Sequence, residues 1–147
     1  MYIPGLDVRL TARYGLAILR IVLGIAMALH GWSKLSGGVG GVAGFFGSLG
    51  IPAPELMAWV VTIVELVGGI LLVVGFLTQI AGILILLDML GVILFAFLLQ
   101  GQPFINENGW ISWEKEAVFG AAALCLALAG PGAWSIDDVV ADSRTIT

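Results

Sequence analysis

The chain has 147 residues, of which 60% are hydrophobic and only 11% are charged, and its mean hydropathy is +1.09. A soluble domain carries about a quarter of its residues as charged side chains, so this composition indicates an integral membrane protein. The net charge is −4, from six basic and ten acidic side chains, without the clustered basic residues that nucleic-acid binding requires. The single cysteine, Cys125, excludes an intrachain disulfide.

The first apolar segment predicts a transmembrane helix over residues 14–35 that is retained rather than cleaved. The segment is longer than the apolar region of a signal peptide, Arg20 interrupts it, and no small-residue cleavage site follows. Arg20 is the unusual residue here. An arginine does not lose its proton in proteins, and charged side chains inside a membrane face the interior of a helix bundle.

Three further apolar segments predict helices over residues 56–77, 80–99 and 113–130, each near the ~20 residues that cross a bilayer core. Helices are expected because backbone polar groups in lipid must be satisfied within the segment. The second and third helices are joined by Thr78 and Gln79 alone, so they must be antiparallel neighbours.

The connection between the first two helices is glycine-rich, "SGGVGGVAGFFGSLGIPAPE", but it lacks the Gly-Lys-Ser/Thr sequence of a phosphate-binding loop. We interpret its part "VAGFFGSLGIPAPE" as a short interfacial or re-entrant piece. At the other end of the chain "PGAW" ends the last helix, because proline and glycine both interrupt helices. Residues 131–147 follow as a polar C-terminal tail.

Each predicted helix has one face of glycine and alanine that also carries ionisable side chains, when residues are placed in steps of three and four. The ionisable residues on these faces are Arg13, Arg20, Lys34, Glu65, Asp88 and Glu116. Small residues let membrane helices approach closely, and charges within a membrane face the bundle interior. We therefore predict an all-α integral membrane fold. It is an antiparallel bundle of four transmembrane helices that forms one membrane domain over residues 1–147.

Arg20, Glu65 and Asp88 are predicted to form an ion-pair or proton network inside the bundle. Counting about 1.5 Å per residue places the three at similar depths, and a buried arginine needs a carboxylate to offset its burial. We expect Glu65 to pair with Arg20 and Asp88 to be the second acceptor, so that the acid in surplus is a candidate proton carrier. The same residues are equally compatible with a structural network that fixes the helix register.

His30, Lys34 and Glu116 form a second predicted cluster, at the outer mouth of the bundle. Glu116 is expected to reach Lys34 or to hydrogen-bond His30, an arrangement that suits binding of an anion or a polar headgroup better than it suits stability. No metal site is predicted, since His30 is the sole histidine. No nucleophile–base pair, triad or cofactor fingerprint is present, so no catalytic residue is assigned and enzymatic activity stays an open question.

Lysines and arginines near the helix ends predict that both termini are cytoplasmic. Arg9, Arg13 and Arg144 lie on the side of the termini, whereas Lys34 and Lys115 lie on the opposite side.

Taken in order, several motifs resemble the DoxX family over Leu19–Asp138. The stretches that carry the resemblance are "LRIVLGIAMALHGWSKL", "FFGSLGIPAPELMAWVVTIVELVGGILLVVGFLTQIAGILI" and "NGWISWEKEAVFGAAALCLALAGPGAWSIDD". The matching single residues are Arg20, His30, Gly31, Lys34, Glu65, Gly69, Gly75, Glu116, Gly130, Gly132, Ser135, Ile136 and Asp137. Asp88 is not among them.

The resemblance implies a four-helix protein of the bacterial or archaeal cytoplasmic membrane, similar to the membrane subunit of thiosulfate:quinone oxidoreductases. We therefore expect an integral membrane subunit of a quinone-linked or other redox complex, with no intrinsic cofactor and with quinone as its candidate ligand. The expected partners are the lipid bilayer and other membrane subunits, and a homo-oligomer is also compatible. Two alternatives stay open: a non-catalytic accessory or structural subunit of a larger membrane complex, and a small-molecule transporter.

Overall fold

The structure, a computed structural model, describes residues 8–144 and the side chains of residues 11–141. Its helices are α1 (Val8–Gly37), α2 (Val39–Ser48), α3 (Pro54–Val74), α4 (Thr78–Val92), α5 (Glu114–Ala129) and α6 (Ile136–Arg144); α4 continues into the π-helical segment η1 (Ile93–Leu98). Over the described residues there is no strand, and one isolated bridge joins Ile105 and Ile111. The predicted all-α class is therefore confirmed for this part of the chain.

Three helices are long and apolar enough to cross a membrane. They are Thr11–Gly37 within α1, Pro54–Val74, and Thr78–Leu98, where α4 and η1 are combined. The chain is therefore a membrane protein whose exposed apolar side chains meet lipid. α5 has 16 residues, so it is shorter than these three, and it packs along α4.

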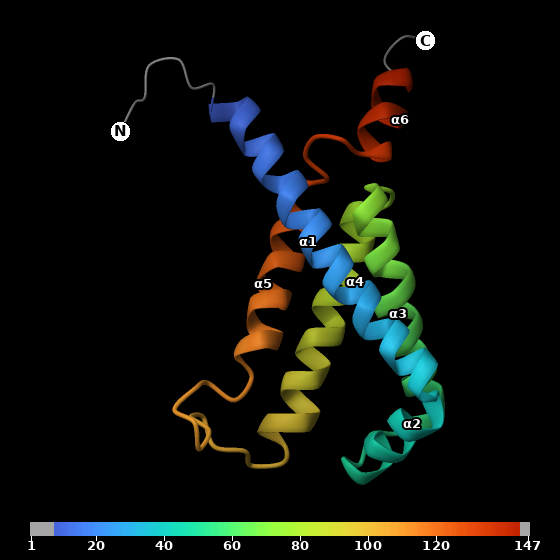
Figure 1. The fold of residues 1–147 in the computed structure, drawn as a ribbon, viewed down its shortest axis with the longest axis vertical. Coiled ribbons are helices and arrows are strands. Elements are labelled where there is room, and N and C mark those ends of the chain that lie inside the picture. Colours follow the sequence, from blue (N-terminus) through green and yellow to red (C-terminus); the bar gives the residue numbers. More distant parts are fainter. Residues whose placement is uncertain (1–7, 145–147) are drawn as a thin grey trace.

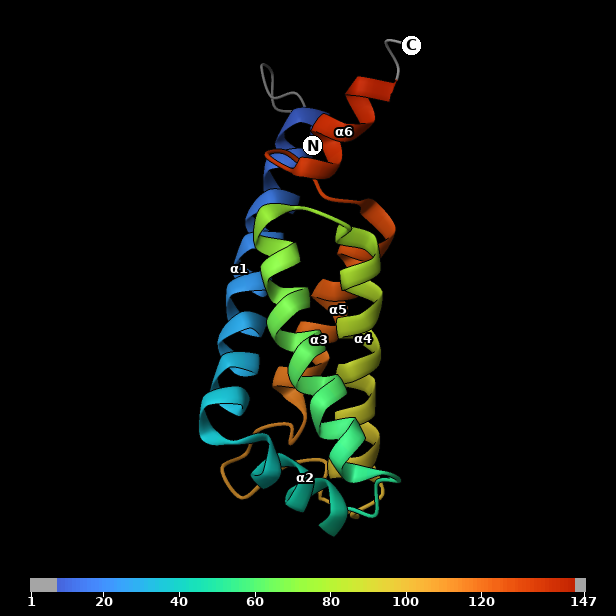
Figure 2. The same cartoon turned by 90° about the vertical axis from the view of Figure 1, so that its right-hand side faces the viewer.

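The helices α1, α3, α4 and α5 run along the long axis of the molecule (Figures 1 and 2). α1 packs chiefly on α3, and α5 packs chiefly on α4. α2 lies across one end of this bundle, whereas α6 lies at the opposite end, beside the start of α1 (Figure 2). We call these the α2 end and the α6 end.

Glycines bring the backbones of α1 and α3 into contact. A β-carbon added at Gly24 would lie 2.7 Å from the carbonyl oxygen of Gly69, and one added at Gly31 would overlap the backbone of Leu66. Backbones approach this closely in membrane helices only where small residues face each other. The contacts place Gly31 beside Leu66, and they set the antiparallel register of the two helices.

The end of α3 is set by Gly75, two residues before the predicted end of this helix. Gly75 has a φ of 71°, and its N–H donates to Leu71 O at 2.9 Å, while the N–H of Phe76 donates to the same oxygen at 3.0 Å. Glycine adopts this left-handed conformation without steric cost, so it is the usual residue after a helix C-terminus. The turn that follows leads directly into α4.

Two short helices occupy segments that the sequence analysis did not assign as helices. α2 lies within the glycine-rich connection, and α6 lies within the polar tail. The side chains of Arg9 and Arg144, on which the predicted orientation partly depends, lie outside the described side chains.

Candidate functional site

Arg20 is fully buried toward the α6 end, where its guanidinium donates hydrogen bonds to backbone carbonyls. Nη1 donates to Leu72 O at 3.1 Å, and Nη2 donates to Ala133 O at 3.2 Å and to Trp134 O at 2.8 Å. Leu72 belongs to the last turn of α3, at the negative end of the helix dipole. The predicted pairing of Arg20 with Glu65 is therefore wrong, because carbonyl oxygens take the place of the expected carboxylate.

The helix register explains why Arg20 and Glu65 do not meet. Gly31 lies beside Leu66, next to Glu65, and residues 20 and 31 are 11 positions apart in α1. At 1.5 Å per residue this separation is about 16 Å along the bundle. An arginine side chain does not span that distance.

Asp137 supplies the negative charge near Arg20 and joins α6 to the rest of the bundle. It interacts electrostatically with Arg20. Its two carboxylate oxygens accept hydrogen bonds from the N–H groups of Leu77 and Thr78, at 2.8 and 2.9 Å. These donors open α4, whose first N–H groups have no partner inside the helix. The residues around Arg20 therefore tie three helix ends together, which is a structural role.

A second group of ionisable side chains lines a cavity of about 390 Å³ toward the α2 end. We call this cavity the chamber. The walls come from α1, α3, α4 and α5, while Phe45 and Phe46 of α2 contribute aromatic rings. The ionisable residues that line the chamber are His30, Lys34, Glu65, Lys115 and Glu116. The chamber thus combines polar groups with the apolar interior of a membrane bundle.

Lys34 and Glu65 form an ion pair in the chamber wall. The side chain of Glu65 is 3% exposed, and that of Lys34 is 26% exposed. Lys34 therefore replaces Arg20 as the partner of Glu65, and Glu65 replaces Glu116 as the partner of Lys34. Burying such a pair costs desolvation energy that its attraction often only offsets, so a contribution to stability does not by itself explain the pair.

His30 is held in one orientation by its own helix. Its Nδ1 lies 2.8 Å from Ala26 O, and donation of the Nδ1 proton to this oxygen leaves Nε2 as the acceptor of the neutral ring. The ring meets Phe119 edge-on, with the ring centroids 6.0 Å apart. His30 therefore lines the chamber with its Nδ1 already engaged by Ala26 O.

Glu116 is buried at the start of α5, with 8% of its surface exposed. Its closest cationic group is the adjacent Lys115, whose Nζ lies 3.4 Å from Oε1. The structure brings Glu116 into the same chamber as Lys34 and His30, as the sequence analysis grouped them. A direct contact of Glu116 with either residue is not among the hydrogen bonds or ion pairs of the described residues.

Asp88 lies on α4, close enough to Glu65 and Lys34 to interact with both electrostatically. The predicted network of Arg20, Glu65 and Asp88 is therefore only partly correct. Lys34 joins the two carboxylates, and Arg20 belongs to a separate structural cluster. A lysine reaching in from the α2 end, rather than an arginine from the α6 end, provides the positive charge.

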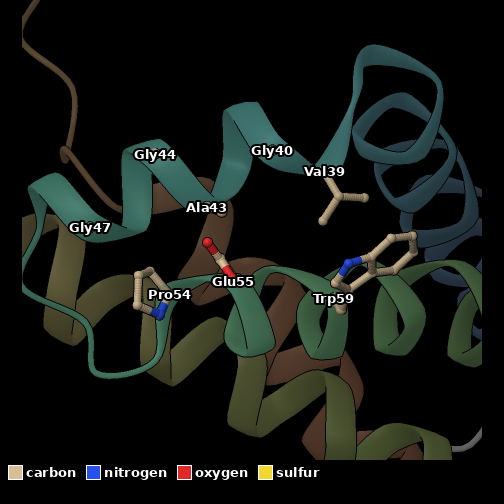
Figure 3. A pocket seen from close by; sticks show the side chains of 8 residues that line it. All are labelled: Val39, Gly40, Ala43, Gly44, Gly47, Pro54, Glu55 and Trp59. Carbon is tan, nitrogen blue, oxygen red and sulfur yellow. The ribbon is translucent and has the colours of Figure 1, made fainter.

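A wider crevice of about 610 Å³ lies between α2 and the start of α3. Figure 3 shows that Glu55 points from α3 toward α2. On the α2 side the crevice is lined by Gly40, Gly44 and Gly47, among other residues. Glu55 is solvent-exposed, and it is the one ionisable residue of the lining. The crevice therefore offers less chemistry than the chamber, which we take as the candidate site.

Sequence reasoning missed two features, one in the chamber and one outside it in the cluster around Arg20. Phe45 and Phe46 line the chamber from α2, and the sequence signal for them was the apolar "GFFG" within a glycine-rich connection. Asp137 was noted as part of a motif, but its role at the start of α4 depends on a contact across 60 residues. Sequence spacing alone does not reveal such a contact.

Comparison with known proteins gives a consistent set of relatives. The DoxX family model matches residues 15–98. The Bacillus subtilis (strain 168) protein named "Putative oxidoreductase CatD" is 41% identical over 126 residues, covering 86% of this chain and 87% of that protein.

Two Escherichia coli (strain K12) proteins are also similar. "Inner membrane protein YphA" is 32% identical over 133 residues, covering 83% of this chain and 87% of that protein. "Inner membrane protein YqjF" is 29% identical over 123 residues, covering 84% and 89% respectively. No solved structure matches this chain significantly.

Proposed function

The chain belongs to the DoxX family of membrane proteins, and from this premise we propose that it is a membrane subunit of a redox complex that acts on quinone. The relative named as an oxidoreductase supports a redox role. The observation that carries the proposal is the chamber, in which the Lys34–Glu65 pair and Glu116 lie inside an apolar bundle.

The chamber suits quinone chemistry because quinone reduction and oxidation move protons together with electrons. Oxidation of a quinol releases a pair of protons and a pair of electrons. In our proposal the chamber carboxylates accept the protons and pass them on, since a positioned carboxyl group is a common general acid or base. A partner subunit that carries a redox group takes the electrons. Ionisable side chains within a membrane commonly mark such proton routes.

We further propose that α5 is a fourth membrane-crossing helix, which completes an antiparallel bundle in a bacterial inner membrane. The names of the two Escherichia coli relatives support this location. The 16 residues of α5 span about 24 Å, a little less than the ~30 Å hydrocarbon core. Both termini would then be cytoplasmic, as the basic residues suggest.

Reporter fusions test this topology. We expect alkaline phosphatase to be active when fused after Gln102 and inactive when fused after Thr147, because α5 separates the two positions. A green fluorescent protein fused after Thr147 should fluoresce, which controls for expression. Equal phosphatase activity at the two positions would show that α5 does not cross, and the reverse pattern would invert the orientation.

Variants of the Lys34–Glu65 pair test whether the charges in the chamber serve function or only structure. Lys34→Met is expected to lower the free energy of unfolding by about 2–4 kcal/mol, because it leaves the Glu65 charge buried without a partner. The double variant Lys34→Met, Glu65→Leu should recover most of that loss in chemical unfolding experiments, since no charge is then stranded.

In the double variant Lys34→Met, Glu65→Leu, turnover should be lost even though the free energy of unfolding is largely restored. Quinone-dependent turnover by the complex purified from native membranes is expected to fall about a hundredfold in the double variant, because the Glu65 carboxylate, the more deeply buried proton-carrying group, is gone. Quinone should also be detectable by mass spectrometry of the gently solubilised wild-type particle. A stable double variant with wild-type turnover would assign the charges a structural role and favour the non-catalytic accessory subunit.

A further inference from the structure

A third cavity, of about 330 Å³, lies between α2, α3 and α4 and extends along η1. We call this cavity the slot. Its walls are apolar except for one carboxyl group, that of Asp88. Val60, Leu84 and Leu87 line it and are also largely exposed on the outside of the bundle, where lipid lies. Side chains on the outer surface of the bundle therefore form part of the slot wall.

The Asp88 carboxyl group is incompletely satisfied. Its Oδ2 is buried and has no hydrogen-bond partner in the described part of the chain. Buried polar atoms without partners are rare because each costs free energy, so a carboxyl group with such an atom in the slot lining is a candidate to bind a hydrogen-bonding ligand. The resemblance to the family does not include Asp88, so this feature comes from the structure.

The slot and the chamber share a wall. Phe45, Phe46, Val61 and Val92 line both cavities. On α4, Asp88 lines the slot, and the next residue, Met89, lines the chamber. Asp88 also interacts electrostatically with Glu65 and Lys34. A hydrogen-bonding group held at Asp88 therefore lies one side-chain layer from the ionisable residues of the chamber.

The helix that carries Asp88 changes its winding beside the slot. α4 gives way to the π-helical segment η1, in which the N–H of Leu99 donates to Leu94 O, five residues earlier, at 2.9 Å. Phe95 and Ala96 of η1 line the slot. π-Helical turns are uncommon and are frequently found at functional sites. This is an observation independent of Asp88.

We propose that the slot binds the ring of a membrane-soluble aromatic alcohol, of the phenol or hydroquinone class, and that the Asp88 carboxyl group accepts the hydrogen bond of its hydroxyl group. The ring would lie among phenylalanine side chains, as apolar pockets with a few polar groups hold small ligands. A carboxylate accepts hydrogen bonds but donates none. With Asp88 ionised, the site therefore prefers the reduced, hydroxyl-bearing form of a ring compound over its oxidised, carbonyl-bearing form.

The inference rests on the proposed function for the role of the ligand in the cell. The binding itself can be measured with this chain alone, without a redox partner. The probe is a hydroquinone with a decyl chain, compared with the matching quinone, under anaerobic conditions with the full chain in lipid nanodiscs. Binding is measured by equilibrium titration and corrected for partition into protein-free nanodiscs. At an alkaline pH that ionises Asp88, we expect the wild type to bind the hydroquinone about tenfold more tightly than the quinone, the effect of one charge-assisted hydrogen bond.

Two variants separate the role of Asp88 from a structural effect. Asp88→Asn keeps the shape and supplies both a donor and an acceptor, so the preference for the reduced form should fall to about twofold or less. Gly91→Phe should abolish binding of both probes. Gly91 lines the slot, and a β-carbon added there meets no atom within 4 Å, so the new ring fills the slot without a backbone clash. Leu90→Phe is the matched control, because Leu90 is exposed and lies outside the lining.

The outcomes distinguish this inference from the proposed function. Equal binding of the two probes by the wild type, an unchanged preference in a folded Asp88→Asn variant, or full binding by Gly91→Phe would each overturn the slot assignment. If quinone co-purifies while the slot variants bind normally, the quinone site lies elsewhere and this inference fails alone. If the slot behaves as expected but no redox partner or turnover exists, the proposed function fails and the binding site stands.

Discussion

Replacing Arg20 with alanine is expected to lower the free energy of unfolding by about 3 kcal/mol or more, since three backbone carbonyls lose a donor and a cavity remains. Arg20 is fully buried, and it donates to Leu72, Ala133 and Trp134. Loss of these bonds releases the end of α3 from the segment that leads into α6. Chemical unfolding in detergent, followed by circular dichroism, measures the change.

Two further variants test the assignment of Arg20 to this cluster. Arg20→Lys should be intermediate in stability, because one ammonium group does not reproduce the planar fork that meets three acceptors. The double variant Arg20→Ala, Glu65→Ala should lose about the sum of the free energies lost by its single changes, because residues more than about 10 Å apart act independently. A double variant more stable than Arg20→Ala alone would restore the predicted Arg20–Glu65 pair and contradict the observed hydrogen bonds.

Replacing Gly69 with alanine is expected to disrupt the bundle about as strongly, through sterics rather than polar contacts. A β-carbon at Gly69 would lie 2.7 Å from the carbonyl oxygen of Gly24 and would overlap the backbone of Ala28. Backbone atoms cannot rotate aside, so α1 and α3 must separate along their main contact. We expect a loss of several kcal/mol, toward the upper part of the ~1–3 kcal/mol range for overpacked cores or beyond it.

Gly68→Ala is the matched control for this prediction. Gly68 is the adjacent residue of the same helix and is also buried, but its added β-carbon would meet Ile85 Cδ1 at 3.6 Å, an ordinary contact. Since alanine favours helix by about 1 kcal/mol over glycine, this variant should be neutral or slightly stabilised. Similar unfolding midpoints for the two variants would show that α1 and α3 are not in backbone contact.

The sequence by itself determined the membrane environment, the helical class and the approximate spans of the long helices, because the bilayer imposes helix length and apolarity on each segment separately. It also placed the glycines that face the interior, and it singled out Arg20, His30, Lys34, Glu65, Asp88 and Glu116 as ionisable residues of interest. These properties are local, since each can be read within one helix.

Only the tertiary structure decided which of these charges meet. The contact of Gly31 with Leu66 sets Lys34, rather than Arg20, beside Glu65. An error of a few residues in the assumed helix ends shifts the estimated depth of a side chain by a helical turn or more. Such a shift is large enough to exchange one candidate ion-pair partner for another. Asp137 reaches the start of α4 across 60 residues, and the residues that line the slot come from α2, α3, α4 and η1. Such contacts depend on how helices pack and turn, and no single segment of the sequence contains that information.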